Sequence, residues 1–593
     1  MRGPHLRLGR SLSTIVCVIG LAVAGLAAPA RADAAAATIT SAIRTVVFGD
    51  PVPLAAAVTG DPACIGPRPI ELDRRSAADP DWVPVAQATT APDGTAAFSD
   101  PPTYTSSYRV TLPATATCPA LESGTLSVRV RVRIDSSLLG SSLTAGSCVQ
   151  LAVTVAPGKP GQSVELQRRT SSGWATVDDL TLDAGSSASA RPCFGWDDLG
   201  IVRLRARWAA QDALNASSTG APLPFRITQA PWMRRVSGAI GDRSMSVAVG
   251  DDGVFLYRHA DATPRAPASN EKLLLSMALL DELGPSYRIP TIAAAERIEG
   301  HVIPGDLWIL GRGDPTLGPA RLAVLARRIA AAGITRIEGR VMGATTYFAR
   351  DWWATGWKPE FRREEVALPT ALTFEGNSAG GVHIRDPERR AAEWLVTRLE
   401  RLGVAVGDGP GAGAPPGGLR PVATVRSEAL AGILRRMNVP SDNFVAEVLG
   451  KLLSARRGGP PGTIAGGARQ IQAWSARHGV EVTSFDGSGL SYADRVTAEG
   501  IVQLLWVADG SSWVPALRAS LPAAGQGTLQ GRLGGVRLRA KTGTLTDVSA
   551  LSGWVWSRAS DGWIEFSILS SGMPKWMASS IEDRVVRILA SSA

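Results

Sequence analysis

The chain reads Ala268-Ser269-Asn270-Glu271-Lys272-Leu273-Leu274-Leu275 at the point that decides the fold of its second half. Most residues that follow, up to Leu283, are too apolar for an exposed helix, and Gly284-Pro285 is a stop signal, so we predict a buried helix. Side chains three residues apart share a face of a helix, which lets Lys272 reach back to the hydroxyl of Ser269. The stretch therefore predicts a nucleophile beside a base. For this stretch alone, a helix cap and a surface charge are the alternative.

Length and composition indicate an exported protein with several globular domains. The 593 residues, of which 45% are hydrophobic and 19% charged, suffice for about four domains of ~150 residues. Residues 1–32 have the pattern of a secretory signal peptide, with basic residues, an apolar segment at 15–27 and the cleavage site Ala30-Arg31-Ala32. The apolar segment is shorter than the ~20 residues that a membrane span needs. We therefore expect cleavage and a periplasmic or extracellular mature protein.

The mature chain keeps four cysteines, namely Cys64, Cys118, Cys148 and Cys193. No two of them form a C-x-x-C pair and histidine is scarce, so we expect disulfides rather than a metal site, and no cofactor. The formal charge of +9 fits either a scattered basic surface or long-range attraction to anionic wall polymers or lipid head groups. No run of five or more like charges marks a binding tail, and nucleic acid is not indicated as a partner.

The N-terminal part of the mature chain has short alternating segments rich in Gly, Pro, Ser and Thr, which are typical of all-β structure. It also repeats, because Glu71-Leu72-Asp73-Arg74-Arg75 recurs as Glu165-Leu166-Gln167-Arg168-Arg169, 94 residues later. This period matches the length of a β-sandwich domain, so we predict two sandwich modules, 38–133 and 134–228. Each module holds two cysteines, and we expect pairing within a module, although four cysteines allow three connectivities. A spacer or a binding role suits these modules better than catalysis.

The second half alternates strands and helices. A hairpin at 245–257 leads into the Ser269 helix, which favours a mixed α/β catalytic domain. A separate stretch then predicts an inserted α/β subdomain with strands at 306–310 and 336–342, helices at 319–332 and 387–402, and a flexible loop at 407–418. Buried helices return at 430–438 and 444–453. We therefore divide this half into 232–291 (catalytic domain, first part), 292–425 (inserted subdomain) and 426–593 (catalytic domain, second part).

Three short motifs carry the candidate chemistry: Ser269-x-x-Lys272, Ser441-Asp442-Asn443 and Lys541-Thr542-Gly543. Lysine is rare in this chain, with only six among 62 lysines and arginines, and two of the six lie in these motifs. Because arginine cannot give up its proton whereas a desolvated lysine can, Lys272 is the expected base. No histidine of the mature chain has a nucleophile-elbow or H-E-x-x-H context, which argues against a Ser-His-Asp triad.

The three motifs stand in the order found in penicillin-interacting serine enzymes. With Gly311-Arg312-Gly313-Asp314 and Asp486-Gly487-Ser488-Gly489, residues 232–593 resemble the D-alanyl-D-alanine carboxypeptidase/endopeptidase family of the penicillin-binding protein 4 type. The 172 residues between Ser269 and Ser441 fit the large insertion of that family. The resemblance implies a penicillin-binding, β-lactamase-like α/β domain. Its expected partners are peptidoglycan stem peptides, with β-lactams as inhibitors, and its expected place is the cell wall.

The resemblance also implies roles for residues of this chain. Ser269 is the nucleophile, Lys272 its base, Ser441 a proton relay to the leaving amine, and Asn443 a group that holds the substrate amide and orients Lys272. The expected substrate-binding residues are Lys541, Thr542, Gly543 and Thr544. The backbone N–H groups of Ser269 and Thr544 are the expected oxyanion hole.

The sequence leaves alternatives for the substrate specificity, the reaction and the role of the β modules. Ala344 stands where family members often carry an Asp that reads a cross-linking diamino acid, so side-chain specificity does not carry over. Alternatives are a β-lactamase or esterase on the same fold, and a catalytically idle wall-binding protein. Asp486, Ser488 and Arg495 suit turn structure and support of the site equally well. The β modules lie outside the resemblance, with a wall polymer or a protein as their expected partner.

Overall fold

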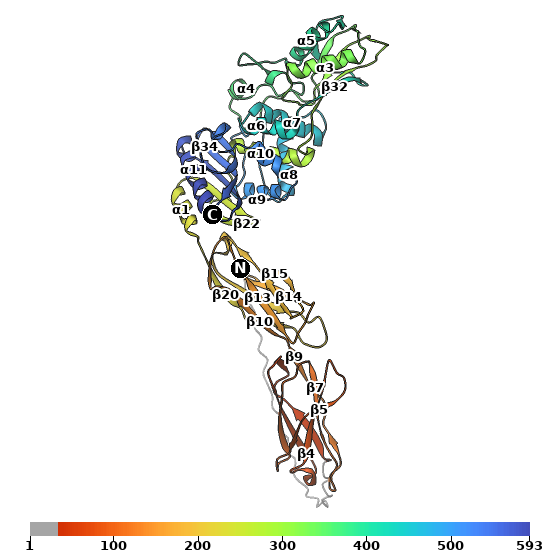
Figure 1. The fold of residues 1–593 in the computed structure, drawn as a ribbon, viewed down its shortest axis with the longest axis vertical. Coiled ribbons are helices and arrows are strands. Elements are labelled where there is room, and N and C mark those ends of the chain that lie inside the picture. Colours follow the sequence, from red (N-terminus) through yellow and green to blue (C-terminus); the bar gives the residue numbers. More distant parts are fainter. Residues whose placement is uncertain (1–33) are drawn as a thin grey trace, which may run out of the picture. The chain divides into compact units, whose positions relative to one another are not determined.

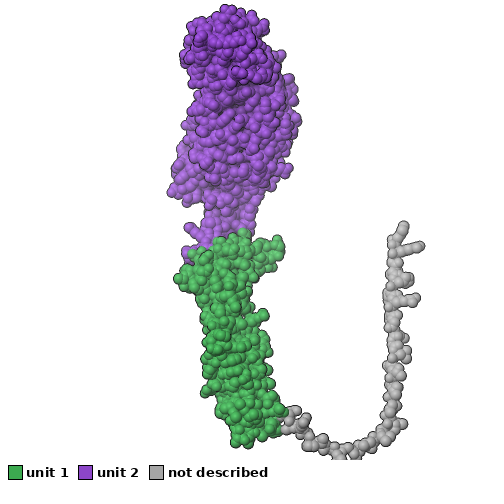
Figure 2. Space-filling view, turned by 90° about the vertical axis from the view of Figure 1, so that its right-hand side faces the viewer, with its two compact units in different colours: residues 1–136, 152–189, 205–222 green, residues 137–151, 190–204, 223–593 purple. Residues whose placement is uncertain are grey.

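The computed structural model describes residues 34–593, so the predicted signal peptide at 1–32 lies outside the described residues. This part of the chain divides into two compact units (Figure 2). Unit 1 runs to Ser136 and includes Ala152–Ser189 and Arg205–Pro222, and unit 2 comprises Ser137–Leu151, Ala190–Leu204 and Leu223–Ala593. Among residues 34–593, no helix has a stretch long and apolar enough to span a bilayer.

The first β module consists of two sheets around one core (Figure 1). One sheet has the order β1 (Ala36–Thr40), β3 (Val52–Thr59), β6 (Thr95–Asp100). The other has the order β2 (Thr45–Val47), β9 (Leu126–Arg131), β7 (Ser106–Leu112), β4 (Pro69–Ser76), β5 (Val83–Thr89), with β8 (Leu121–Glu122) beside β7. Burial alternates along β3, β7 and β9, because every second side chain enters the shared core.

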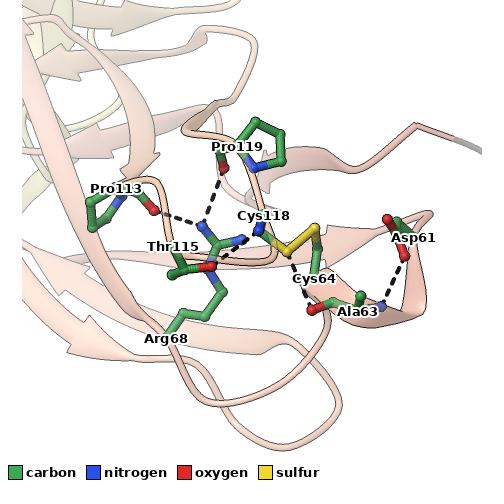
Figure 3. Close-up of a disulfide and its surroundings, with 8 residues drawn as sticks. All are labelled: Asp61, Ala63, Cys64, Arg68, Pro113, Thr115, Cys118 and Pro119. Atoms are coloured by element: carbon green, nitrogen blue, oxygen red, sulfur yellow. Dashed lines mark hydrogen bonds between the residues drawn. A yellow bond between two sulfur atoms is a disulfide. The ribbon is translucent and has the colours of Figure 1, made fainter.

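Two disulfides lie within the predicted modules. Cys64, at the end of the 3₁₀ turn η1 (Pro62–Cys64), is bonded to Cys118, and Figure 3 shows Thr115 and Arg68 beside the bond. The backbone N–H of Cys118 donates to Thr115 Oγ1 at 3.1 Å. Cys148 is bonded to Cys193. The predicted pairing within each module is therefore confirmed.

The second β module divides between the two units. In unit 1, β14 (Ser163–Thr170) pairs antiparallel with β15 (Gly173–Thr181), and β13 (Leu151–Ala156), β16 (Ser187–Ala190) and β19 (Ser218–Thr219) fall wholly or largely there. In unit 2, β20 (Leu223–Thr228) pairs with β11 (Ser142–Thr144) and with the first residues of β18 (Gly200–Trp208). The remaining elements are β10 (Arg133–Leu138), β12 (Ser147–Cys148), β17 (Cys193–Phe194) and η2 (Trp196–Asp198).

The sequence repeat has a structural counterpart in these modules. The guanidinium groups of Arg75 and Arg109 both lie over the ring of Trp82, at 4.9 and 4.5 Å from its centroid. In the same way, those of Arg169 and Arg205 lie over the ring of Trp174, at 5.8 and 4.1 Å. Arg75 and Arg169 end the two repeated segments, so the repeat preserves a cation–π stack as well as the sandwich pattern.

The catalytic part has a five-stranded antiparallel sheet in the order β22 (Val254–His259), β21 (Met245–Asp251), β35 (Gly562–Ser571), β34 (Val548–Ser557), β33 (Leu538–Leu545). Strands β34 and β35 are buried at nearly every residue rather than at alternate ones. Such continuous burial requires cover on both faces. Helices α11 (Lys575–Ser592) and α1 (Pro231–Ile240) pack side by side, α11 against β34 (Figure 1), and α9 (Ala498–Asp509) packs against β21 and β35. The predicted hairpin is confirmed as β21 and β22.

A helical cluster adjoins this sheet and holds the predicted buried helix. The 3₁₀ turn η3 (Ala268–Asn270) runs into α2 (Glu271–Leu283), which ends at Gly284 with φ 74°. Around α2 lie α6 (Leu430–Asn438), α7 (Asn443–Gly458), α8 (Ile464–Arg477) and α10 (Val514–Ser520). The turn η5 (Gly527–Leu529) is bonded to the residue after α6, because the N–H of Thr528 donates to the Val439 carbonyl. Asp442 caps α7 by accepting the N–H of Val445 at 2.9 Å, so this helix starts one residue earlier than predicted. It also ends later than predicted, at Gly458, followed by Gly459 with φ 79°.

The inserted region has a core of its own. Its main sheet has the order β31 (Gly411–Gly413), β27 (Val341–Ala344), β25 (Leu307–Leu310), β23 (Pro290–Ala295), β32 (Arg420–Arg426). Helices α3 (Pro319–Ala331) and α5 (Pro387–Glu400) lie together beside it (Figure 1). A small parallel sheet comprises β24 (Val302–Ile303), β26 (Arg336–Ile337) and β30 (Ala405–Val406), and shorter elements are α4 (Phe361–Glu364), η4 (Glu375–Asn377), β28 (Ser378–Ala379) and β29 (Val382–His383).

Two predictions for the insertion were wrong in detail. The strand predicted at 336–342 is two strands, β26 and β27, in different sheets, because the chain crosses the backbone of Gly305 at Gly339. The loop predicted at 407–418 contains the short strand β31, whose backbone pairs in parallel with β27. Two of its three residues are glycines, which have no side chain that could indicate a strand in the sequence.

Candidate active site

Ser269 and Lys272 lie side by side where η3 meets α2. Lys272 Nζ donates to Ser269 Oγ at 3.0 Å, to Asn443 Oδ1 at 2.7 Å and to the Ser488 carbonyl at 2.6 Å. Lys272 is fully buried. An ammonium group has three protons, and these three acceptors use all of them. Once one proton is lost, the lone pair of a neutral Lys272 can take the proton of Ser269 while the other two contacts hold the amine.

The electrostatics of this position favour the neutral amine. Burial lowers the pKa of Lys272 to about 8, against the opposing charges of the carboxylates Asp486 and Glu447. A lysine in water has a pKa near 10.4, so it is almost wholly protonated at neutral pH. The site thus holds a far larger fraction of free amine than an exposed lysine would, which suits a general base.

Ser441 belongs to the link between α6 and α7 and has φ 65°, an unusual conformation for a residue with a side chain. Lys541 Nζ donates to Ser441 Oγ and to the Thr542 carbonyl, both at 2.9 Å. Burial, followed by the positive charges of Lys272 and Lys575, lowers the pKa of Lys541 well below its usual range. Charge repulsion from Lys272 and Lys575 acts in the same direction as burial, and burial acts more strongly.

The Lys541-Thr542-Gly543 motif lies inside strand β33. A Cβ on Gly543 would lie 2.6 Å from the carbonyl oxygen of Pro267, so only glycine lets β33 pack directly on the start of η3. Ala268, which follows Pro267, has φ 47°. This close approach brings Ser269 and Thr544 to the same wall of a cavity.

The cavity has a volume of about 360 Å³ and contains five of the predicted site residues, Ser269, Ser441, Asn443, Thr542 and Thr544. Lys272, Lys541 and Gly543 lie behind its wall, fully or almost fully buried. Reasoning from the sequence missed other lining residues, among them Lys358, Glu365, Tyr492, Thr528, Arg532 and Lys575. The rarity of lysine was a usable signal for two of these. Ala344, at the end of β27, is buried and is not among the residues that line the cavity.

Two buried carboxylates build the loop that contacts Lys272. Asp486 accepts the N–H groups of Gly489 at 2.6 Å and Ser491 at 2.9 Å. Glu447, on α7, accepts the N–H of Ser488 at 2.8 Å. These bonds fix the Ser488 carbonyl against Lys272. Burial raises the pKa of Glu447 to about 8. Of the three residues that suited either turn structure or support of the site, Asp486 and Ser488 contribute to the contacts of Lys272. The side chain of Arg495 bonds only to the backbone carbonyls of Tyr492 and Asp494.

Comparison with known proteins identifies the family. The model of the D-Ala-D-Ala carboxypeptidase 3 (S13) family matches residues 237–378 and 367–592. A D-alanyl-D-alanine carboxypeptidase of Actinomadura sp. (strain R39) is 28% identical over 432 residues, 58% of this chain and 80% of that protein. Carboxypeptidase DacB of Mycolicibacterium smegmatis is 30% identical over 341 residues, 52% of this chain and 72% of that protein.

A solved structure has the same fold over the catalytic part. Penicillin binding protein 4 (dacB) from Haemophilus influenzae superposes with a TM-score of 0.53 at 19% identity, covering 60% of this chain and 99% of that one. The fold of the second half is therefore the mixed α/β fold of penicillin-binding proteins. Together with the family match over residues 237–592, this shows that the chain belongs to the D-Ala-D-Ala carboxypeptidase 3 (S13) family.

Proposed function

We propose that this chain is a serine-type D-Ala-D-Ala carboxypeptidase that cleaves peptidoglycan stem peptides through an acyl-enzyme, with or without DD-endopeptidase activity, and that β-lactams acylate the same serine. One observation carries the proposal, namely the 3.0 Å contact between Ser269 Oγ and the fully buried Nζ of Lys272. It gives the nucleophile a base that needs no histidine.

The reaction begins when Ser269 Oγ attacks the carbonyl of the penultimate D-alanine and neutral Lys272 takes the hydroxyl proton. The backbone N–H groups of Ser269 and Thr544 stabilise the oxyanion, since both residues line the cavity beside the close contact of η3 and β33. Ser441, bonded to Lys541, relays the proton that Lys272 took from Ser269 to the leaving amine of the terminal D-alanine, so that Lys272 is neutral again. Water then attacks the acyl carbonyl and gives its proton to Lys272, and Ser269 regains a proton from Lys272 as the shortened peptide is released.

The remaining site residues bind the substrate. Asn443 holds Lys272 through its Oδ1 atom and offers its amide to the substrate. Lys541, Thr542, Gly543 and Thr544 form the strand along which the peptide lies, and the lack of a side chain at Gly543 permits close approach of the peptide backbone. The hydroxyl of Thr542 donates to Thr528 Oγ1 at 2.6 Å, and both residues line the cavity that would receive the substrate carboxylate.

We also propose a division of the chain into domains and a role for the β modules. We assign 38–133 and 134–228 to two β modules that act as spacers or bind a wall polymer or a protein. Residues 232–291 and 426–593 form the catalytic domain, and 292–425 form the inserted subdomain. Removal of residues 1–32 on export places the enzyme in the periplasm or at the cell wall.

Covalent labelling with a fluorescent penicillin tests this function. We expect wild type to be labelled and Ser269→Ala to remain unlabelled. Ser276→Ala, on the same helix, is the matched control that keeps labelling, because Ser276 Oγ contacts only the Lys272 carbonyl and Asn438. Labelling of Ser269→Ala at the wild-type level would refute the assignment. Digestion of purified monomeric and cross-linked muropeptides then measures carboxypeptidase and endopeptidase activity separately.

A β-lactamase is the second candidate on this fold, and the labelling experiment separates it from a peptidase. A β-lactamase would release the hydrolysed penicillin within the assay, whereas a DD-peptidase keeps the label for much longer than one turnover of its peptide substrate. The family relationship and the separate inserted region favour the peptidase.

A further inference from the structure

The wall of the cavity beside Thr542 and Thr544 carries two cations that no motif includes. Lys575 is the first residue of α11, and Arg532 belongs to the segment between η5 and β33. Both line the cavity together with Ser269, Thr528 and Thr542. Of the six lysines of the chain, only Lys358 and Lys575 are partly exposed, and both line this cavity.

Lys541, by contrast, is poorly placed to bind an anion in the cavity. It is fully buried, and its Nζ bonds to Ser441 Oγ and the Thr542 carbonyl. It is not among the residues that line the cavity. Lys541 would therefore act on a substrate carboxylate only at longer range, with Ser441 between them, and not by direct contact.

Lys575 has a free donor at the cavity. Its Nζ donates to the Gly543 carbonyl at 3.0 Å and to Ser549 Oγ at 2.5 Å. An ammonium group has three donors, so one is left without a partner among the described residues. Its contact with Gly543 also fixes Nζ beside the strand that holds Thr542 and Thr544.

Arg532 stands next to this group and is itself held in place. Its Nε and Nη2 atoms donate to Asp583, and Nη2 also donates to Glu582 at 2.8 Å. No bond of Nη1 to any described residue is formed, so its two N–H donors are available. Glu582 and Asp583 contact Arg532 directly, whereas they act on Lys575 only through space, so the Lys575 ammonium group forms its bonds with neutral partners and has no carboxylate in contact among the described residues.

We infer that Lys575, assisted by Arg532 and by the hydroxyls of Thr528, Thr542 and Thr544, binds the terminal carboxylate of the substrate peptide. This inference rests on the proposed function, because it assigns the group that recognises the free end of the D-Ala-D-Ala peptide. Bonds between an ammonium group and a carboxylate are shorter and about twice as strong as neutral ones. The site would therefore select peptides with a free C-terminus.

The test compares two substrates on purified full-length variants, an N-acylated tripeptide that ends in D-Ala-D-Ala and the same peptide with a C-terminal carboxamide. For Lys575→Met we expect kcat/KM on the free acid to fall about 10- to 100-fold, the loss of one bond to a charged group, with little change on the carboxamide. Lys575→Arg, which keeps the charge, should restore part of the preference. The readout is the ratio of the two kcat/KM values. Loss of the Gly543 contact could also damage β33, but this would lower kcat/KM for both substrates by the same factor and leave the ratio unchanged.

Lys358→Met is the matched control, since Lys358 is the other partly exposed lysine of the cavity but contacts Thr546 and Tyr492 instead. Its ratio should equal that of wild type. Equal losses on both substrates in Lys575→Met would overturn the inference while leaving the proposed function intact, provided that penicillin still labels Ser269. A wild-type enzyme that neither binds penicillin nor cleaves either peptide would instead refute the proposed function.

Discussion

Lys272 and Lys451 are both fully buried, on neighbouring helices, yet their surroundings differ. Lys451 Nζ lies 2.7 Å from a carboxylate oxygen of Asp351 and donates to the carbonyls of Ala349, Asp351 and Pro369. Lys272 has no carboxylate in contact and bonds to a hydroxyl, an amide oxygen and one carbonyl. Burial lowers the pKa of both.

The difference shows what separates a structural buried lysine from a reactive one. Every acceptor around Lys451 stabilises the cation, and its contacts attach the segment that carries Lys358 and Glu365 to α7. Around Lys272, the Ser269 hydroxyl can reverse its role and donate its proton once the amine is neutral. Four experiments test this difference between the two lysines.

Replacing Lys272 should have the largest effect. We expect Lys272→Met and Lys272→Arg to lower the rate constant of acylation by penicillin about 10³-fold or more, because neither side chain can accept the proton of Ser269. Stopped-flow measurement with a fluorescent penicillin gives this rate constant. If Lys272→Arg acylates within tenfold of wild type, Lys272 is not the base.

Replacing Lys451 should affect stability instead. Lys451→Met leaves the Asp351 carboxylate and three carbonyls without their cation, which we expect to cost about 3–5 kcal/mol in the free energy of unfolding. Urea denaturation followed by tryptophan fluorescence measures this loss. The folded variant should still be acylated at close to the wild-type rate. If Lys451→Met is as stable as wild type but is acylated much more slowly, Lys451 has a catalytic role and not a structural one.

The pH dependence of acylation should follow the pKa of Lys272. Below its pKa of about 8 the amine holds a proton and cannot accept another, so the rate constant should fall about tenfold per pH unit and level off above pH 8. Rates between pH 5 and 10 provide the profile. A rate that is constant from pH 5.5 to 9 would exclude neutral Lys272 as the acceptor.

Neutralising one nearby carboxylate should have the smallest effect. Only the ionised fraction of Glu447, whose own pKa is about 8, raises the pKa of Lys272, so Glu447→Gln should move the midpoint of the profile downward from about 8 by less than about one pH unit. The amide oxygen of glutamine still accepts the N–H of Ser488. Asp351→Asn, beside Lys451, is the matched control and should leave the midpoint where it is. An upward shift in Glu447→Gln would mean that the carboxylate does not act on Lys272 by its charge.

Sequence patterns predicted the elements whose signals are local. Helix α6 has the predicted bounds, and α2 ends at the predicted glycine, because apolar periodicity and a stop signal lie within a few residues of each other. The division of 336–342 into β26 and β27 was missed because pairing with β24 and β25 decides it. Such partners lie tens of residues away, where no local pattern reports them.

In the candidate site, too, only the residues with local signals could be predicted from the sequence. Ser269, Lys272, Ser441, Asn443 and Lys541 were predicted because they sit in short motifs with a fixed order. Lys575 is brought to the cavity by the packing of α11 on β34, and Arg532 is held there by its ion pairs with Glu582 and Asp583 of α11, so no spacing in the sequence reveals them. Glu447 had a weak signal, as an acidic residue within the apolar segment predicted to be a buried helix.

The distribution of lysines has a practical consequence for labelling and immobilisation. Reagents that modify side-chain amines cannot reach four of the six lysines, because each of these is at most 3% exposed, namely Lys159, Lys272, Lys451 and Lys541. They will react at Lys358 and Lys575, both at the rim of one cavity. A dye attached through amines would therefore respond to occupancy of the substrate cavity. A support coupled in this way would block the cavity that it was meant to display.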